Sequence, residues 1–428
     1  MAFSVLQGAF ITYIPHVWLM ENSRQLALKK WVEQLNDRKR KYFFEKYLFK
    51  KSREPFSLNS FWNSFKNDVL FISRQIYIAA KQLKAFGPHI QKEYGAPFYV
   101  QFYRLLYLTL VVKSNAEQFR KRLLFKNSSW YYVKQYDYGQ THTQIQLARN
   151  SFPDEIAIIE DKFRFYRHCK NNEIKTPEVL AVFSNGKQIY PENRPFVLPS
   201  EDLFIKERMG GKGNHAKKFS YSQPFYGSAN QEKYTKQELL KFVIDESQRY
   251  DLIVQRSLVN HDQQKPFTNG ALSTCRIVTV KKPDQSDIFP LFTVLRMPCG
   301  SKDVDNYAQG GLLSTINIET GMLGRAVTYL PYKGRFEFDE HPVTHQKISG
   351  FRLPLWREML EFAIESHKQF RSLAVGWDVC YSEKGIYLIE GNLRWGSSLY
   401  ECPEQKPFRE TCYPAVYDAL ISKYSNDE

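Results

Sequence analysis

The sequence lacks several features that would assign it to a familiar class of protein. Its six cysteines are scattered without a CxxC pair, which argues against a zinc site and against a disulfide scaffold. No apolar stretch approaches the roughly 20 residues that a membrane-spanning helix needs. No basic segment followed by an apolar one opens the chain. We therefore expect a cytoplasmic protein in a reducing setting, and peripheral attachment to the inner membrane face stays open.

Acidic residues are scarce in the N-terminal third of the chain. Residues 1–150 hold 24 Lys and Arg against 9 Asp and Glu, whereas the remaining residues hold 36 of each kind. The whole net charge of +15 therefore lies in the first third. Such an asymmetry is typical of a surface that meets an anionic partner, here a membrane surface or a glycan. A basic helical surface that is merely solvated explains the charge equally well.

Helical periodicity dominates this basic region. Apolar residues at helical spacing predict helices over residues 23–50, 61–86 and 98–125, and Gly87-Pro88 is the expected end of the second helix. Aromatic residues lie among the basic residues 120–122, and packed helix faces explain them better than stacking on bases, so nucleic acid is not the expected partner. Because 428 residues exceed one ordinary core, we predict a basic helical domain followed by a second module.

After residue 150 the pattern changes to short β-runs and helices, and we place the domain boundary there. The run at residues 156–160 is interpreted as the end of a strand, and residues 163–172 and 353–369 as helices. The predicted strands are apolar runs between turn residues; they cover residues 179–183, 203–206, 252–255, 275–280, 291–295, 312–318, 375–380 and 386–390. Their mostly hairpin order predicts an α+β fold with antiparallel sheets.

The last predicted hairpin carries three oxygen ligands. Side chains alternate along a strand, so Glu390 and Asn392 point the same way, and Asp378 lies on the preceding strand. Carboxylate and amide oxygens suit a hard cation such as Mg²⁺, which is bound in proteins by one or two carboxylates together with phosphate oxygens and water. Taken alone, an ordinary exposed turn explains this pattern better.

Two lysines and a glycine-rich stretch precede this hairpin. Lys206 ends an apolar strand that runs into residues 209–215, where glycines allow backbone N–H groups to approach phosphate oxygens closely. The stretch matches neither GxxxxGK[ST] nor GxGxxG, so neither common nucleotide motif applies. Lys162 stands at the start of a predicted helix. A glycine-rich hairpin with incidental lysines is the alternative.

A polar connector and two arginines complete the set. Residues 255–258 follow an apolar strand, and the backbone of such a connector can pair with the edge of an adenine. Arg276 and Arg296 lie in or beside predicted strands and would meet in a cleft if those strands line it. Guanidinium groups suit phosphate or acyl-phosphate charge. A lone arginine is more often a partner in a surface ion pair.

The order of these residues resembles the ATP-grasp superfamily over residues 160–394. The separations of 12 and 14 residues from Asp378 to Glu390 and Asn392 are similar to those of ATP-grasp carboxylate–amine ligases. Four stretches resemble the sugar-transfer-associated ATP-grasp group, namely residues 273–279, 304–311, 341–344 and 375–378.

This resemblance implies a fold and a set of roles. Two α+β lobes with mostly antiparallel sheets would sandwich ATP, with the flap and adenine hinge in residues 151–260 and the metal-binding lobe in residues 261–428. The residues implied to contact ATP are Lys162, Lys206, Gly210, Gly211, Lys212, Gly213, Gln255, Arg256, Ser257 and Leu258. Arg276 and Arg296 would be catalytic. Asp378, Glu390 and Asn392 would hold Mg²⁺. His215 and His341 are interpreted as structural or substrate-facing.

The activity implied is that of an ADP-forming ligase, which uses ATP and Mg²⁺ to join a carboxylate to an amine through an acyl phosphate. The group's association with polysaccharide biosynthesis makes a sugar or cell-surface polysaccharide precursor the expected substrate. One alternative is a phosphotransferase that acts on a hydroxyl or another acceptor. Another is a non-catalytic nucleotide-binding scaffold that docks on an anionic surface through residues 1–150.

Overall fold

A computed structural model describes residues 58–138, 152–210, 215–228, 231–268, 270–281, 287–299, 307, 310–412 and 414. Residues 72–424 form one compact unit, and residues 1–71 with 425–428 form another. The helix predicted over residues 23–50 and the stretch at 304–306 lie outside the described residues. Among the described residues, no helix is both long enough and apolar enough to cross a bilayer.

The basic N-terminal region is helical, as predicted, but two of the predicted boundaries are wrong. Its helices are α3 (Leu58–Tyr94), α4 (Phe98–Leu106), the π-helix η2 (Tyr107–Val111), α5 (Gln118–Lys121) and α6 (Asn127–Tyr131). The helix predicted over residues 98–125 is therefore broken after Val111.

Helix α3 continues through Pro88, where the sequence predicted its end. A proline in a helix interior removes one backbone hydrogen bond and disfavours the helix. Here the residues that follow Pro88 in the helix pack against distant parts of the chain. Ile90 is 1% exposed. The ring of Tyr94 lies 4.7 Å from that of Phe125, and its hydroxyl accepts the backbone N–H of Phe336 at 2.9 Å. Tertiary packing thus outweighs the local cost of the proline.

Residues 156–160, predicted as the end of a strand, belong to helix α8 (Pro153–Glu160). A proline at the first helical position and acidic residues in the first turn are helix-start signals, and they outweigh the short apolar run that looked like a strand. Helix α9 (Lys162–Asn171) follows and confirms the helix predicted over residues 163–172. Asp161 caps α9, because its carboxylate accepts the backbone N–H of Phe163 at 2.9 Å.

The first sheet, sheet A, is antiparallel and has the strand order β2-β1-β7-β3-β4-β5-β6. Its strands are β1 (Val179–Ser184), β2 (Lys187–Tyr190), β3 (Leu203–Glu207), β4 (Lys217–Ser222), β5 (Phe225–Ser228), β6 (Lys233–Tyr234) and β7 (Leu252–Arg256). Helix α10 (Lys236–Glu246) buries Leu239 and Val243 in the core of this sheet. The strands predicted over residues 179–183, 203–206 and 252–255 are confirmed.

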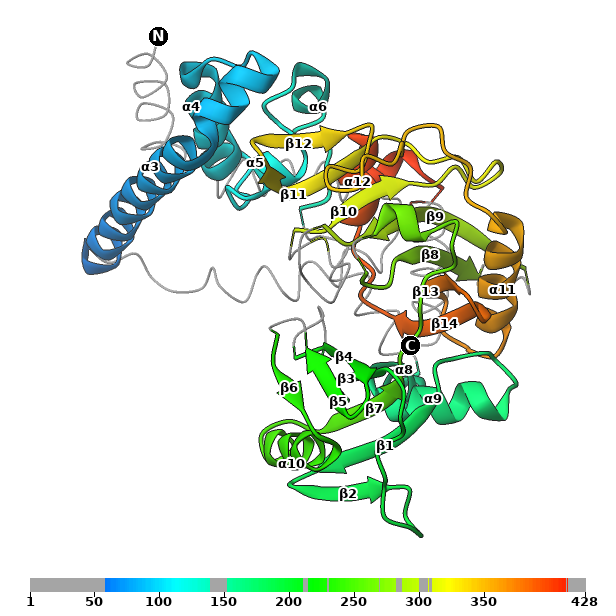
Figure 1. The fold of residues 1–428 in the computed structure, drawn as a ribbon. Coiled ribbons are helices and arrows are strands. Elements are labelled where there is room, and N and C mark those ends of the chain that lie inside the picture. The colour runs from blue at the N-terminus through cyan, green and yellow to red at the C-terminus, as the bar shows by residue number, and fades with distance from the viewer. Residues whose placement is uncertain are drawn as a thin grey trace, which may run out of the picture. The chain divides into compact units, whose positions relative to one another are not determined.

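The second sheet, sheet B, is also antiparallel, with the order β12-β11-β10-β9-β8-β13-β14 (Figure 1). Its strands are β8 (Thr274–Lys281), β9 (Ile288–Met297), β10 (Leu312–Thr315), β11 (Ala326–Tyr332), β12 (Arg335–Phe338), β13 (Ala374–Ser382) and β14 (Gly385–Asn392). Helix α11 (Trp356–Lys368) packs on it, and α12 (Ser398–Glu404) follows β14; short 3₁₀ turns lie at Lys265–Phe267 and Phe408–Glu410.

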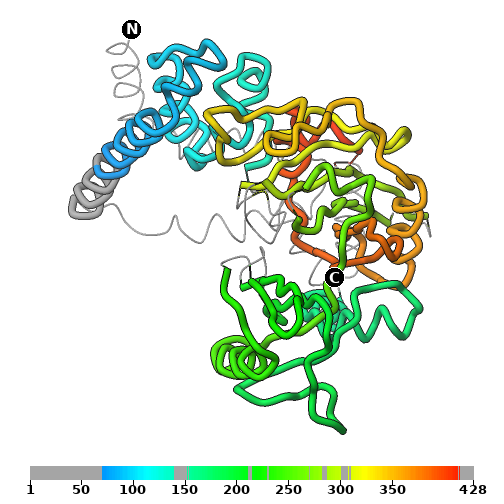
Figure 2. The backbone as a smooth tube through the Cα atoms, viewed as in Figure 1, coloured from blue at the N-terminus to red at the C-terminus, as the bar shows by residue number. Residues whose placement is uncertain are grey.

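All five strands predicted in this region are present, although β10 is shorter than predicted. The chain completes sheet A before it begins sheet B, as its trace shows (Figure 2). Two antiparallel sheets with helices confirm the predicted α+β class.

The helical segment from residue 72 to residue 138 packs against sheet B and α12. Lys126 pairs with Glu337 of β12 at 2.7 Å, and Arg120 donates to the carbonyl of Tyr329 in β11 at 3.2 Å. Arg122 forms a buried ion pair with Glu401 of α12 at 2.6 Å. Part of the basic charge of this region is therefore used inside the molecule. The domain boundary at residue 150 stays a prediction.

A buried histidine beneath sheet B leads to a prediction about pH. Trp377 donates its indole N–H to the hydroxyl of Thr279 at 2.7 Å, and this hydroxyl lies 2.7 Å from Nδ1 of His367. Nε2 of His367 lies 2.6 Å from the carbonyl of Ser372, which can only accept a hydrogen bond. Nε2 therefore carries the proton. Thr279 donates to Nδ1, and the imidazole is neutral.

Acid is expected to destabilise the fold through this histidine. Burial lowers the pKa of His367 from 6.5 to about 3. Since the unfolded chain binds the proton first, the free energy of unfolding should fall by about 1.4 kcal/mol per pH unit between pH 6.5 and pH 3. Urea denaturation at several pH values measures this slope. His367→Gln should flatten the slope, whereas His345→Gln, at an exposed position, should leave it unchanged. Equal slopes in the unmodified protein and in both variants would contradict the assignment of a neutral, buried imidazole to His367.

Candidate active site

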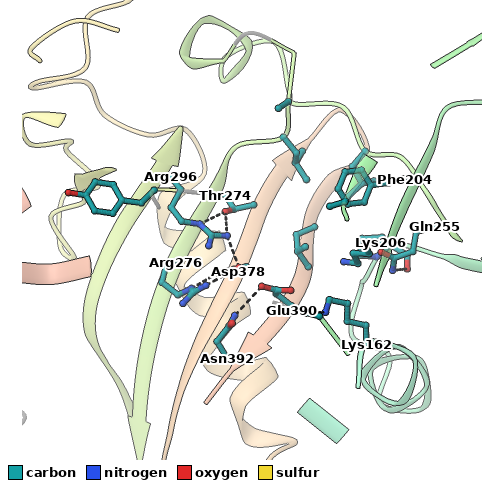
Figure 3. A pocket seen from close by; sticks show the side chains of 18 of the residues that line it. Lys162, Phe204, Lys206, Gln255, Thr274, Arg276, Arg296, Asp378, Glu390 and Asn392 are labelled. Atoms are coloured by element: carbon teal, nitrogen blue, oxygen red, sulfur yellow. Dashed lines mark hydrogen bonds and ion pairs between the residues drawn. The ribbon is translucent and has the colours of Figure 1, made fainter. Parts of the chain in front are cut away.

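A cavity of about 400 Å³ is lined by residues from both sheets. It brings together twelve of the residues predicted from the sequence (Figure 3). These are Lys162, Lys206, Gly210, Gln255, Arg256, Ser257, Leu258, Arg276, Arg296, Asp378, Glu390 and Asn392. The other three, Gly211, Lys212 and Gly213, lie outside the described residues.

The hairpin β13–β14 supplies the carboxylates. Its register places Asp378 opposite Glu390 and Gly376 opposite Asn392. Because side chains alternate along β14, Glu390 and Asn392 share a face, and the amide of Asn392 donates to Glu390 at 3.4 Å. The predicted convergence of the three side chains is confirmed as geometry. Their role as metal ligands stays a prediction.

Asp378 is surrounded by the two predicted arginines. Arg276 of β8 donates through Nε and through NH2, the latter at 3.1 Å, and Arg296 of β9 donates at 2.6 Å. Asp378 is 1% exposed. Burial alone would raise the pKa of Asp378, but the two guanidinium groups outweigh burial and lower it to about 2. The aspartate is therefore ionised, and it fixes both arginines.

A glycine makes room for this arrangement. A Cβ atom at Gly376 would lie 3.1 Å from Cδ of Arg276 and 2.6 Å from Cβ of Trp395. Any side chain there would displace the guanidinium or the indole. The absence of a side chain at position 376 therefore lets Arg276 reach Asp378 across the sheet.

The donor set fits a hard cation. A carboxylate offers about four lone pairs, and Asp378 uses three of them for guanidinium N–H groups, one on Oδ1 and two on Oδ2. Glu390 lies opposite Asp378 in the register and is in side-chain contact with it, and Asn392 contacts Glu390 in turn. Oxygen-only donors of this kind match Mg²⁺. Within the described ranges no group of three His, Cys, Asp or Glu side chains could hold a metal ion, so an ion bound here would also need the amide of Asn392.

Two lysines of the other lobe face this hairpin (Figure 3). Lys206 of β3 is 7% exposed. Burial lowers the pKa of Lys206 to about 8, although Glu390 and Asp378 act to raise it. Lys162, at the first turn of α9, donates to the carbonyl of Gly210. Within the part of the chain that the structure describes, the ammonium of Lys206 has no hydrogen-bond acceptor. It can therefore donate to an anionic ligand.

In the connector after β7, two backbone N–H groups have partners among the described residues and a third has none. The backbone N–H groups of Arg256 and Ser257 donate to the carbonyls of Glu178 and Asp202 at 3.0 and 3.1 Å. The backbone N–H of Leu258 donates no hydrogen bond to a backbone carbonyl of any described residue. The side chain of Arg256 pairs with Glu178 and Glu201. Leu258 lines the cavity, and its role in an adenine hinge stays a prediction.

Sequence reasoning missed several residues of the cavity. Thr274 accepts hydrogen bonds from Arg296 at 2.9 and 2.6 Å and so orients it. Thr274 lies two residues before Arg276, on the same face of β8, and this alternation was a usable signal. Lys121 and Arg394 also line the cavity, and for Lys121 the local sequence holds no signal.

His215 and His341, which the sequence suggested as structural or substrate-facing residues, do not line the cavity. Nε2 of His341 lies 3.0 Å from the carbonyl of Pro298, and its Nδ1 faces two backbone N–H groups, so His341 is structural. His215 lies 3.5 Å from Glu207, and its ring lies 4.3 Å from that of Tyr250.

A family of proteins matches the region that contains this site. The model for the sugar-transfer associated ATP-grasp family matches residues 143–412, well over half of the chain. The chain belongs to this family. Every predicted site residue lies inside the matched range, whereas most of the basic N-terminal region lies outside it.

Solved structures with partial similarity to this ATP-grasp protein are ligases and synthases. D-Alanine-D-alanine ligase from Helicobacter pylori shares 11% identity with a TM-score of 0.33, over 61% of this chain and 58% of that one. N5-carboxyaminoimidazole synthase from Aspergillus clavatus shares 13% identity with a TM-score of 0.29, over 57% and 46%. L-Amino acid ligase from Bacillus licheniformis shares 9% identity with a TM-score of 0.31, over 56% and 42%.

The chain thus spans less than two thirds of the length of each of these three proteins. A comparison with curated proteins gave no significant match. The family assignment rests on the sequence match alone, since all three TM-scores are low.

Proposed function

We propose that this protein is an ATP- and Mg²⁺-dependent ligase that activates a carboxylate as an acyl phosphate and joins it to an amine. One observation carries the proposal. The cavity is lined by eight Lys and Arg side chains against three Asp and Glu. Among these cations, Arg256 and Lys218 pair with described carboxylates outside the lining, and Lys121 forms a surface pair with Glu117. A deep, cation-rich cavity binds a polyanion such as a triphosphate, because buried charges need compensation.

The lysines and the connector account for the binding of ATP. Lys206 is buried and lacks an acceptor among the described residues, and Lys162 is held near it by Gly210. Phosphate oxygens would supply the missing acceptors and would favour the charged form of Lys206. The free backbone N–H of Leu258 and the ring of Phe204 line the same cavity and suit the edge and the face of an adenine.

Glu390, Asn392 and Asp378 would hold Mg²⁺. The ion, when bound, neutralises charge on the phosphate oxygens during transfer. Arg276 and Arg296 are aimed by Asp378 and Thr274 before any substrate arrives. Such preorganised donors stabilise charge that develops in a transition state without further reorganisation.

The reaction has two steps. An oxygen of the substrate carboxylate, steered by Arg276 and Arg296, attacks the γ-phosphorus of ATP, and the bond from that phosphorus to the β–γ bridging oxygen breaks to release ADP. The amine nitrogen then attacks the carbonyl carbon of the acyl phosphate. Phosphate leaves, and the nitrogen loses a proton as the amide forms. The family's association with sugar transfer supports a uronic acid or an amino sugar as substrate.

Hydroxylamine trapping tests this proposal. The full chain is incubated with ATP, Mg²⁺, hydroxylamine and a panel of uronic acids and amino acids. We expect a hydroxamate in equal amount to the ADP released, since hydroxylamine replaces the amine at the acyl phosphate. ADP formed with hydroxyl-bearing acceptors and without hydroxamate would instead show a phosphotransferase. ATP binding without any turnover would show a nucleotide-binding scaffold.

A further inference from the structure

The cavity extends beyond the residues that the proposed binding of ATP uses. Its remaining lining includes Lys121, Tyr307, Arg394, Ser398 and Leu399. Two of these side chains are cations and two carry hydroxyl groups, and this subset contains no carboxylate. The proposed triphosphate site between Lys162, Lys206 and the hairpin uses none of these five residues, so they are available to a second substrate.

Arg394 continues the row of polar side chains that begins in β14. Residues 391, 393 and 395 are buried, whereas Glu390, Asn392 and Arg394 are half-buried or exposed. Strand β14 ends at Asn392, but the alternation of burial continues, and Arg394 lines the cavity. Within the described ranges Arg394 forms no ion pair, unlike Arg276 and Arg296 on the neighbouring strands. Its guanidinium is thus available to a ligand.

Lys121 reaches the same cavity from the N-terminal helical segment. Its ammonium lies 4.7 Å from the centroid of the Tyr329 ring and 3.8 Å from the carboxylate of Glu117, which is half exposed. An ion pair of that kind in water contributes little. The next residue, Arg122, forms the buried ion pair with Glu401 of α12. Helix α12 begins at Ser398, which also lines the cavity. The position of Lys121 is therefore fixed by the fold.

We propose that Lys121 and Arg394 form a subsite for an anionic group, a phosphate or a carboxylate, on the second substrate. This inference rests on the proposed function, because it takes the other end of the cavity to be filled by ATP. It makes the N-terminal segment a part of the active site. It also predicts that the second substrate carries a negative charge apart from its reacting group.

Pyridoxal 5′-phosphate tests the subsite without knowledge of the substrate. Its aldehyde forms an imine with a lysine amine and releases water, its phosphate occupies an anion site, and borohydride reduction fixes the adduct for mass spectrometry. The full chain is saturated with a non-hydrolysable ATP analogue and Mg²⁺. We expect Lys121 to react at least about tenfold faster with pyridoxal 5′-phosphate than with pyridoxal, which lacks the phosphate. Exposed Lys406 is the control lysine and should show no such preference.

Arg394→Gln should remove most of the preference of Lys121 for the phosphorylated reagent and leave its reaction with pyridoxal unchanged. Competition by inorganic phosphate or by succinate then shows which anion the subsite prefers. If Lys121 reacts like Lys406, or if Arg394→Gln has no effect, the subsite is wrong. The ATP analogue should separately protect Lys162 and Lys206 from labelling. Failure of that protection would overturn the proposed function, whereas its success beside an unreactive Lys121 would overturn the subsite alone.

Discussion

Glu390→Gln is expected to lower the rate of ATP turnover by about 10³-fold, since loss of one preorganised electrostatic group costs 10²–10³-fold and this residue also serves a metal. The substitution keeps the shape of the side chain but replaces a charged oxygen donor by a neutral amide. It should also weaken binding of ATP at alkaline pH. Glu390 acts to raise the pKa of Lys206, so without Glu390 this pKa falls from about 8 to a lower value, and the ammonium loses its proton at a lower pH.

The control for this experiment lies in the same hairpin. Glu383 stands at the turn, 49% exposed, and pairs with Lys265 on the surface. Glu383→Gln should leave turnover within about twofold, because exposed ion pairs contribute little. Mn²⁺ binding, followed by electron paramagnetic resonance with the ATP analogue present, gives a readout that does not depend on turnover. Unchanged Mn²⁺ affinity in Glu390→Gln would remove Glu390 from the metal site, whatever happens to the rate.

Arg122→Met is expected to lower the free energy of unfolding by about 3–5 kcal/mol, the usual cost of removing one partner from a buried ion pair. The side chains of Arg122 and Glu401 are 2% and 0% exposed. Glu401 also accepts the backbone N–H groups of Asp137 and Phe408, each at 2.9 Å. Loss of the guanidinium would leave a buried carboxylate with these two as its only donors among the described residues. Urea denaturation measures the change.

The effect of Arg122→Met should grow with pH. Burial raises the pKa of Glu401 above its ordinary value, and Arg122 partly offsets this shift. Without Arg122 the folded-state pKa rises further, so the variant is least affected below about pH 4.3 and loses stability as pH increases. Adding Glu401→Gln removes the buried charge but keeps the acceptor, and should recover at least about 1 kcal/mol.

Arg409→Ala, at an exposed site nearby, is the control and should change stability by less than about 0.5 kcal/mol. A double variant that is less stable than Arg122→Met would show that Glu401 is not the group left unpaired. A negligible effect of Arg122→Met would mean that the N-terminal segment does not depend on this contact with α12.

Local patterns in the sequence were sufficient for the strands and for the hairpin. The run from Val375 to Cys380, a turn with glycine and a second run fix the pairing, and alternation then brings Glu390 and Asn392 to one face. The same patterns failed at residues 156–160, because four apolar residues in a row fit a helix and a strand equally well. They failed again at Pro88, where contacts with distant residues keep α3 helical.

The sequence by itself determined the class of fold, the order of the cationic and acidic side chains and their resemblance to ATP-grasp proteins, because these depend on spacing and residue type along the chain. Only the tertiary structure decided that Asp378 holds Arg276 and Arg296, residues 102 and 82 positions away. It also placed Lys121 in the cavity and buried Arg122 against Glu401, 279 positions away. A charged side chain can be buried only where a partner meets it, and the folded chain alone supplies that partner.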